Sequence, residues 1–225
     1  ELAVLQNWFF SQWEALRSYA AQRDIVIIGD LPIFVALDSA DTWAAQQLFD
    51  LDADGQPRNV AGVPPDYFSA TGQRWGNPLY LWDRHEADGF SWWIRRVEQN
   101  LQLFDLLRID HFRAFEAYYS IPASEPTAIR GTWLPGPGQP LFTALREHLG
   151  ELPVIAEDLG IITPEVEALR DANGLPGMRV LQFAFGGNPR DPYLPHNHVP
   201  RSVVYTGTHD NDTTAGWYAQ APEAE

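Results

Sequence analysis

Four acidic side chains stand directly after short apolar segments of the chain, and this repetition is the first sign of a site. They are Asp30, Asp110, Glu157 and Asp210. An apolar run that ends in an acid is typical of a buried strand whose carboxyl end reaches a polar edge. Because parallel strands present their carboxyl ends at one edge of a sheet, we expect these carboxylates to lie close together.

Arg108 interrupts the apolar run 106–109, two residues before Asp110. Residues two apart in a strand point to the same side, so the guanidinium and the carboxylate should share a face. A neighbouring cation keeps a carboxylate ionised, as a carboxylate nucleophile requires. A purely structural ion pair explains this stretch equally well, and the other strands that end in acids favour the catalytic interpretation.

If the strands follow chain order, Asp110 and Glu157 lie on adjacent strands, with their carboxyl groups roughly 5 Å apart. A separation of about 5–5.5 Å is typical of retaining glycosidases. Asp110 is then the predicted nucleophile, and Glu157, which has no cation beside it in the sequence, is the predicted proton donor. Asp210 would hold sugar hydroxyls or the transition-state charge. His209 would donate a hydrogen bond to the same sugar, although a buried structural histidine is nearly as plausible.

A divalent metal site is the main competing interpretation, because imidazole and carboxylate side chains follow the same strands: His111, Glu157, His209 and Asp210. Metal-dependent barrel hydrolases usually present two histidines from one strand. The only such pair here is His196 and His198, in a proline-rich loop. That location favours a surface role, so we expect no metal.

The acidic run at residues 50–55 resembles the start of an EF-hand calcium loop. Its twelfth position is Ala61, where such a loop needs a bidentate glutamate, so the match fails. Asp54 and Gly55 instead predict a hairpin turn.

Buried strands alternate with segments of helical spacing along the chain. The expected strands are 25–29, 106–109, 153–156, 178–184 and 202–206, and helical spacing covers 2–22, 91–104, 140–149 and 164–173. This alternation predicts an α/β fold with a parallel sheet. Acids at strand ends suit a (β/α)8 barrel, and a doubly wound open sheet would use the same edge. No glycine-rich phosphate loop follows any strand, so nucleotide binding is not expected.

Two further segments outside these strands lead to predictions of their own. In the helix over 2–22, five apolar side chains at near-helical spacing predict one buried stripe: Leu5, Trp8, Phe9, Leu16 and Tyr19. Residues 50–90 form a long insertion dense in proline, glycine and aromatic residues. So long an insertion in a compact domain is usually a lid or a binding loop.

Composition narrows the class of protein. Among 225 residues, 15 Lys and Arg stand against 30 Asp and Glu, so nucleic acid and anionic membranes are poor partners. We find no apolar stretch of about 18 residues and no secretory signal, and we expect a cytoplasmic enzyme. The absence of cysteine excludes thiolate catalysis and disulfides. Nine Trp residues suit stacking on sugar rings, although a structural role is the safer reading of any single one.

Three short motifs resemble conserved regions of the α-amylase clan of glycosidases: Arg108-Ile-Asp110-His, Glu157-Asp-Leu and His209-Asp210-Asn. Four longer strings resemble the 4-α-glucanotransferases, also called amylomaltases or disproportionating enzymes. These strings are Gly29-Asp30-Leu-Pro-Ile-Phe-Val-Ala, Asp38-Ser-Ala-Asp-x-Trp43, Gly62-Val-Pro-Pro-Asp-Tyr-Phe-Ser69 and Gly72-Gln-x-Trp-Gly-Asn-Pro-Leu-Tyr80. The resemblance extends from about residue 2 to residue 218.

The resemblance implies a (β/α)8 barrel with loop insertions and a retaining double displacement on α-1,4-glucans. It makes Asp110 the nucleophile, Glu157 the acid/base and Asp210 the transition-state stabiliser. Further residues would contact the maltooligosaccharide substrate or orient the carboxylates: Asp30, Arg108, His209, Asn211, Asp66, Gln73 and Trp75. Asp66, Gln73 and Trp75 fall on the family's loop over the cleft. The resemblance implies no metal and no organic cofactor.

Family chains are much longer than this one. We expect residues 1–225 to form part of one catalytic barrel, roughly its strands three to seven, with residues 44–90 as an insertion over the active-site cleft. The remaining barrel strands of the full-length enzyme would then be the partner of residues 1–225, and this segment can be inactive without them. An α-glucan hydrolase of the same clan is the close alternative, and a non-catalytic glucan-binding segment is the alternative from another class.

Overall fold

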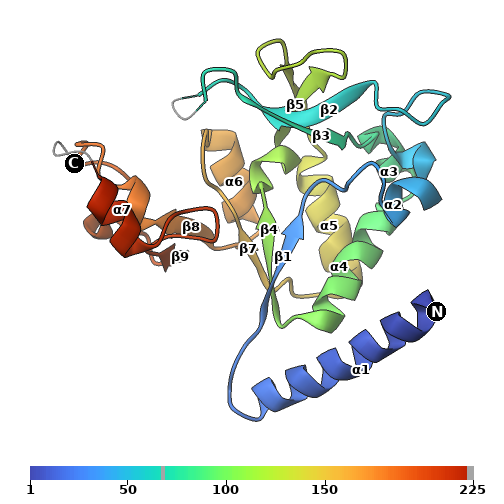
Figure 1. Ribbon diagram of the computed structural model, residues 1–225, viewed down its shortest axis with the longest axis horizontal. Coiled ribbons are helices and arrows are strands. Elements are labelled where there is room, and N and C mark those ends of the chain that lie inside the picture. Colours follow the sequence, from blue (N-terminus) through green and yellow to red (C-terminus); the bar gives the residue numbers. More distant parts are fainter. Residues whose placement is uncertain (67–68, 222–225) are drawn as a thin grey trace. The chain divides into compact units, whose positions relative to one another are not determined.

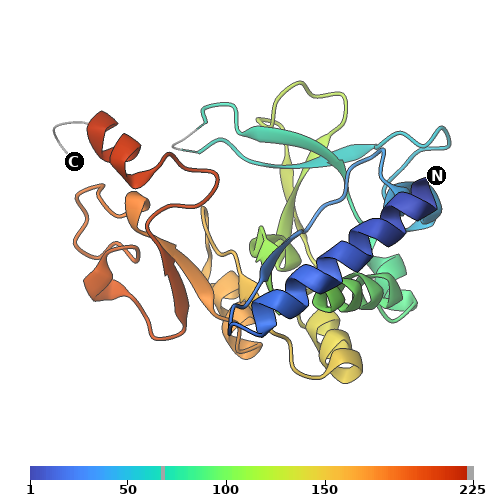
Figure 2. The same cartoon turned by 60° about the horizontal axis from the view of Figure 1, so that its bottom comes forward.

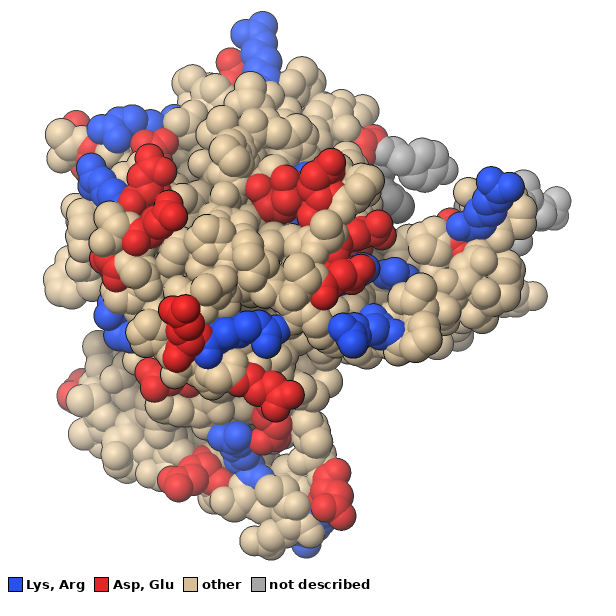
Figure 3. All heavy atoms as spheres, turned by 180° about the vertical axis from the view of Figure 1, so that it is seen from behind, with Lys and Arg blue, Asp and Glu red and all other residues tan. Residues whose placement is uncertain are grey.

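The protein is described here by a computed structural model, which covers residues 1–66 and 69–221. The chain divides into two compact units, Glu1–Val154 and Ile155–Glu225 (Figure 1). In the described part, no helix combines the length and the apolar character needed to cross a bilayer. Figure 3 shows acidic side chains spread over one face, with basic side chains between them. The α/β class expected from the sequence is confirmed.

A parallel sheet of order β1-β4-β7 carries the first of the predicted acids. β1 spans Ile28–Pro32, β4 spans Leu106–Asp110 and β7 spans Val154–Ala156. In the register of β1 and β4, Ile28 lies opposite Leu106 and Pro32 lies opposite Asp110. Leu107 and Ile109 are almost completely buried, which explains the apolar composition of β4. The expected neighbours in chain order are therefore confirmed for these three strands.

Helices of the first unit cover this sheet. α4 (Ser91–Leu103) contacts β1, β4 and α5 (Gly138–Leu149). α4 buries Trp93 and Val97, which lie within the segment 91–104 whose spacing predicted a helix. Around Trp93, rings from α3 (Trp82–Ala87) and its neighbours form an aromatic cluster that includes Tyr80 and Phe115. Several of the many aromatic residues are thus used for the core.

A second sheet, antiparallel and of order β3-β2-β5-β6, lies beyond the carboxyl ends of β1 and β4 (Figure 1). Its strands are β2 (Asn59–Val63), β3 (Gln73–Pro78), β5 (Ala117–Pro122) and β6 (Thr132–Pro135). None of these four strands was expected from the sequence: β2 and β3 lie within the insertion 50–90, and β5 and β6 follow the short 3₁₀ turn η2 (Phe112–Phe115). Val60, Tyr119 and Ile121 bury the small core of this sheet. Much of the expected long loop is thus regular structure.

Along the chain between β1 and β2, α2 (Ala40–Ala44) and η1 (Gln46–Leu48) lead into a tight turn. The Oδ1 atom of Asp52 accepts hydrogen bonds from the backbone N–H of Asp54 and Gln56, at 2.9 and 2.8 Å. Gly55 adopts φ 76°, and Leu51 forms an antiparallel bridge with Pro57. The hairpin turn predicted at Asp54 and Gly55 is confirmed.

α1 (Leu2–Ala21) contradicts the prediction of a buried stripe. The five residues of that stripe are all more than half exposed, from Leu16 at 51% to Trp8 at 59%. The helix contacts α4 through a different face, where Trp13 Nε1 donates to the Leu103 carbonyl at 2.9 Å and Arg17 pairs with Asp105 at 2.8 Å. Figure 2 shows α1 at the surface. Spacing identified the helix correctly but could not say what would cover it.

The second unit contains the parallel pair β8 (Gly177–Val180) and β9 (Ser202–Tyr205). Its helices are α6 (Pro164–Ala172) and α7 (Thr214–Gln220), with short 3₁₀ turns η3 (Leu181–Phe183) and η4 (Pro195–Asn197). The strand expected over 178–184 ends early, because the chain turns into η3 after Val180. Similarly, the strand expected over 25–29 forms only from Ile28 and continues through Pro32, whose ring suits a strand end.

Candidate active site

Arg108 lies between two of the predicted carboxylates. Its Nε atom is 3.4 Å from Asp30 Oδ1, and its Nη2 atom donates to Asp110 Oδ1. The guanidinium is buried, whereas both carboxylate side chains are 44% exposed. One rigid cation therefore holds two acids that are open to solvent at the end of the sheet. The prediction that Arg108 and Asp110 share a face is confirmed.

His111 follows Asp110 in the left-handed backbone region, at φ 53°. A non-glycine residue in that region costs about 1–2 kcal/mol, so the surrounding packing must compensate. Burial is the main cause that lowers the pKa of His111 to about 4, with Arg113 lowering it further and Asp110 raising it. The imidazole is accordingly neutral near pH 7.

Trp75, an aromatic side chain of the predicted substrate loop, contacts His111 directly. The ring of Trp75, on β3, meets His111 edge to face, with centroids 4.9 Å apart. Trp75 Nε1 donates to Gln73 Oε1 at 3.0 Å, and Phe34 lies on another side at 6.3 Å. Trp75 remains 39% exposed, so part of its face is available for stacking on a sugar ring. The structure therefore brings Trp75, and with it Gln73, to His111, the residue that follows Asp110.

Asp66, the remaining predicted residue of that loop, shapes the loop itself. Its Oδ1 atom accepts from Ser69 N at 2.8 Å, and its own N–H donates to the Ser69 carbonyl at 3.0 Å. Ser69 Oγ in turn donates to the Gly72 carbonyl at 2.8 Å. Residues 67 and 68, which belong to the same motif, lie outside the described residues.

In the second unit, Glu157 follows β7 and is 8% exposed. Its Oε1 atom accepts from Leu159 N at 2.9 Å, which orients the carboxyl group. Burial next to an apolar strand is the environment expected for a carboxyl group that acts as a proton donor. The position of Glu157 therefore agrees with the environment argued from the sequence.

The sequence interpretation missed the role of Asp158, the next residue. Asp158 is 3% exposed, accepts from Met178 N at 2.7 Å, and pairs with two buried arginines, Arg170 and Arg179. The two consecutive acids at 157 and 158 are visible in the sequence, but no sequence pattern connects Asp158 to arginines further along the chain. This network anchors the segment that carries Glu157.

Asp210 occupies a loop after β9 with its neighbours His209 and Asn211. His209 Nε2 lies 3.5 Å from Asp210 Oδ1, and these side chains are 66% and 72% exposed. Asn211 Oδ1 accepts from Thr208 N at 2.9 Å and from the Thr208 hydroxyl at 3.0 Å. The alternative of a buried structural histidine at His209 is therefore wrong. Asn211 braces the loop, and the other two side chains are available for a ligand.

The carboxylates are divided between the units, since Asp110 belongs to the first and Glu157 and Asp210 belong to the second. The predicted separation of Asp110 and Glu157 stays a prediction. Across residues 1–66 and 69–221, the histidine and acid side chains form no group of three suited to a metal ion. His196 and His198 contact the backbone carbonyls of Pro189 and Tyr193 within their own loop.

Comparison with known proteins identifies the family to which this site belongs. The family model described as 4-alpha-glucanotransferase, glycoside hydrolase family 77, matches residues 2–225. The chain belongs to this family. It is 63% identical over 225 residues to a 4-alpha-glucanotransferase of Thermus thermophilus, covering 99% of this chain and 45% of that protein. It is 51% identical to the chloroplastic/amyloplastic enzyme of Solanum tuberosum, covering 100% of this chain and 39% of the other.

A solved structure with the same fold is the amylomaltase of Streptococcus agalactiae in complex with acarbose. The two superpose with a TM-score of 0.93 at 45% sequence identity, over 98% of this chain and 45% of that one. This chain therefore spans less than half the length of the relatives that it matches. The resemblance stated from the motifs is confirmed.

Proposed function

We propose that the protein to which this chain belongs is a 4-α-glucanotransferase, which transfers α-1,4-glucan segments between maltooligosaccharides or starch chains. The observation that carries the proposal is the Asp30–Arg108–Asp110 group, followed directly in the chain by His111, which the exposed ring of Trp75 contacts. It combines a carboxylate held by a cation with an aromatic surface, and a retaining reaction on a sugar uses both. The family membership supports the same activity.

In the proposed mechanism, Asp110 attacks the anomeric carbon of the donor glucan while Glu157 protonates the departing glycosidic oxygen. The bond from that carbon to the leaving glucan breaks, and a bond to the Asp110 carboxylate forms. Glu157 then removes the proton from the 4-hydroxyl of an acceptor glucan, which displaces Asp110 and regenerates the α-linkage. Asp210 stabilises the positive charge of the two transition states.

The remaining predicted residues bind or orient the substrate in this proposal. Arg108 and Asp30 set the position of Asp110, Trp75 stacks on a sugar ring, and polar side chains of both units bind hydroxyl groups: Asp66, Gln73, His209 and Asn211. The acarbose bound to the Streptococcus agalactiae amylomaltase supports an oligosaccharide ligand. No metal or organic cofactor has a role in these steps. The acidic net charge of −15 supports neutral sugars over nucleic acids or anionic membranes as partners.

We further propose that residues 1–225 are part of a single catalytic (β/α)8 barrel of a cytoplasmic enzyme, roughly its strands three to seven, with residues 44–90 as an insertion over the cleft. The parallel β1-β4-β7 sheet and the parallel β8-β9 pair support this architecture. The exposed apolar residues of α1, such as Leu5 and Phe9, favour contact with the remaining barrel strands.

Incubating the complete enzyme with maltotriose tests the function. Glucose together with maltopentaose and longer glucans is the result expected of transfer, and the Asp110→Asn variant should lose all products. Glucose and maltose without longer products would show that water is the acceptor, which is the hydrolase alternative. Binding of maltotriose without any turnover in the complete enzyme would favour the non-catalytic alternative.

A further inference from the structure

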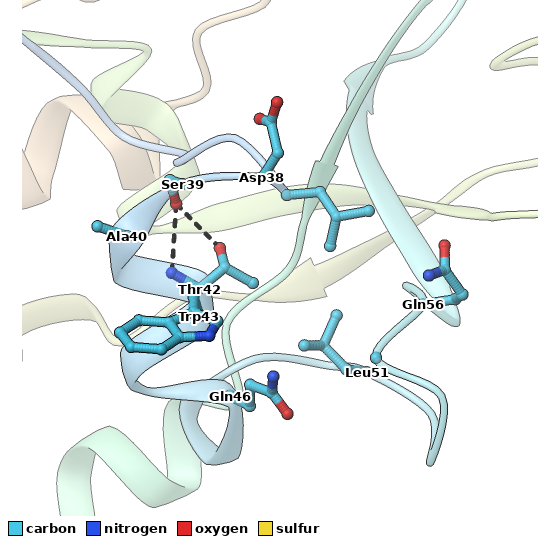
Figure 4. A pocket seen from close by; sticks show the side chains of 10 residues that line it. Asp38, Ser39, Ala40, Thr42, Trp43, Gln46, Leu51 and Gln56 are labelled. Carbon is cyan, nitrogen blue, oxygen red and sulfur yellow. Dashed lines mark hydrogen bonds between the residues drawn. The ribbon is translucent and has the colours of Figure 1, made fainter.

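The first unit contains a pocket whose lining includes none of Asp30, Arg108 and Asp110. It lies between α2 with η1 on one side and the hairpin turn that contains Gly55 on the other (Figure 4). Its volume is about 440 Å³. This value falls within the range of about 300–1,000 Å³ that is usual for small-molecule sites.

The most exposed large aromatic side chain of the described residues lines this pocket. Trp43, on α2, is 79% exposed and makes no ring-to-ring contact within residues 1–66 and 69–221. Transfer of the apolar surface of an indole ring from water to contact with another apolar surface is favourable. Leu51, on the opposite wall, adds a further apolar surface. The pocket therefore suits a ligand with at least one apolar face.

Polar groups with free hydrogen-bonding capacity surround that apolar surface. Asp38, Gln46 and Gln56 line the pocket, and their side chains make no hydrogen bond within the described part of the chain. A glutamine amide both donates and accepts, as does a hydroxyl group. No lysine or arginine lines the pocket, so it offers nothing to neutralise an anion. A neutral ligand rich in hydroxyl groups fits this chemistry better than a phosphate or a carboxylate.

The walls are already held in place without a ligand. Ser39 Oγ accepts from Thr42 N at 3.2 Å, and the Thr42 hydroxyl donates to the Ala36 carbonyl at 2.9 Å (Figure 4 shows the first of these). Across the pocket, Asp52 fixes the turn that carries Gln56. A site formed in advance avoids the entropy cost of ordering its residues when a ligand binds.

We propose that this pocket is an auxiliary α-glucan-binding site, in which a glucosyl ring stacks on Trp43 while Gln46, Gln56 and Asp38 bind its hydroxyl groups. A glucosyl ring combines an apolar face of C–H groups with a rim of hydroxyls, which matches the pocket. The choice of glucan as the ligand rests on the proposed function. The site would hold long glucans on the enzyme without taking part in bond cleavage.

The test measures amylose binding by native affinity electrophoresis of the complete enzyme, with Asp110→Asn in every variant so that the polymer is not consumed. Trp43→Ala should raise the dissociation constant for amylose about fivefold to tenfold, because stacking on an aromatic ring is lost. Tyr218→Ala is the matched control, since Tyr218 is 78% exposed but lies on α7, outside the pocket. The Tyr218→Ala variant should bind amylose as tightly as the Asp110→Asn parent does.

Gln56→Ala gives a second, independent reading in case Trp43→Ala does not fold. Gln56→Ala should weaken amylose binding less than Trp43→Ala, since it removes only hydrogen bonds. Unchanged binding in both variants, or equal losses in the Tyr218→Ala control, would overturn the proposal.

Kinetics separates this proposal from the proposed function. In the background with Asp110 intact, Trp43→Ala should leave maltotriose transfer unchanged and raise the KM for amylose. If the complete enzyme fails to convert maltotriose but binds amylose through Trp43, the proposed function is wrong and the auxiliary site stands. If transfer proceeds and Trp43→Ala changes neither the KM nor the binding of amylose, only the auxiliary site is wrong.

Discussion

Arg108 and Asp30 lie opposite one another in the register of two parallel strands, and this pairing places the arginine Nε 3.4 Å from the Asp30 carboxylate. The same guanidinium donates to Asp110, two residues further along β4. One buried cation therefore contacts both carboxylates at this edge of the sheet. The arginine thereby holds the proposed nucleophile in position at the end of β4.

Replacing Arg108 with methionine should reduce maltotriose transfer by the complete enzyme at least about 100-fold. The variant removes the donor that positions Asp110, and catalysis loses steeply when a nucleophile is misplaced by about 1 Å. The measurement is the initial rate of glucose release. Arg58→Met is the matched control, because Arg58 pairs with Asp50 at 3.3 Å but is 57% exposed. A wild-type rate in Arg108→Met would refute the proposed role of the arginine.

Stability should decrease in mild acid because of His85. This side chain is fully buried among Tyr80, Trp82 and Trp92, and burial is the main cause that lowers its pKa to about 4. The unfolded chain therefore binds a proton near pH 6.5, whereas the folded chain does not, so the free energy of unfolding falls as the pH drops from about 6.5 to 4. For His85 alone, the maximum loss is about 3 kcal/mol.

Urea unfolding of the chain at pH 7 and pH 4.5 measures this loss. His85→Phe should show a smaller loss between the two pH values than the wild type. His111 contributes a loss of the same sign, since its pKa is also lowered to about 4. The variant should therefore keep part of the pH dependence. An unchanged difference between pH 7 and pH 4.5 in His85→Phe would contradict the assignment.

The buried Asp158 should be worth more to stability than an exposed acid on the same arginine. Asp158→Asn removes the buried counter-charge that Arg170 and Arg179 share, and breaking a buried ion pair typically costs about 3–5 kcal/mol. Asp171→Asn removes the other carboxylate of Arg170, at 2.8 Å, but that side chain is 62% exposed, so we expect a loss below about 1 kcal/mol. Thermal unfolding of both variants gives the comparison, and equal losses would show that burial of the network is unimportant.

Gly62 should not tolerate a side chain. A Cβ atom at this position would lie 2.1 Å from the Gln73 carbonyl oxygen, so β2 and β3 would have to separate. Overpacking of this kind costs about 1–3 kcal/mol, so Gly62→Ala should lower the unfolding free energy by that amount. At Gly186 the added atom would meet nothing within 4 Å, and Gly186→Ala is the control. Denaturant unfolding that fails to distinguish the two variants would contradict the close packing of β2 on β3.

Local patterns were enough to locate the strands that carry the acids. The run 106–109 became β4 with one added residue, and 202–206 became β9 with one fewer, because a short apolar run is typical of a strand. The pairing of Arg108 with Asp110 was also predictable, since it depends only on the two-residue period of a strand. The motifs around these acids were specific enough to indicate the family.

Contacts between distant segments were beyond the reach of such patterns. Nothing in the sequence placed Asp30 opposite Arg108, connected Asp158 to Arg170 and Arg179, or brought Trp75 to His111. The antiparallel strands β5 and β6 were hidden in a segment rich in proline and glycine, and the apolar stripe of α1 proved exposed. Periodicity reports the conformation of one segment, whereas register, burial and ion pairing depend on which other segment packs against it, and only the folded chain decides that.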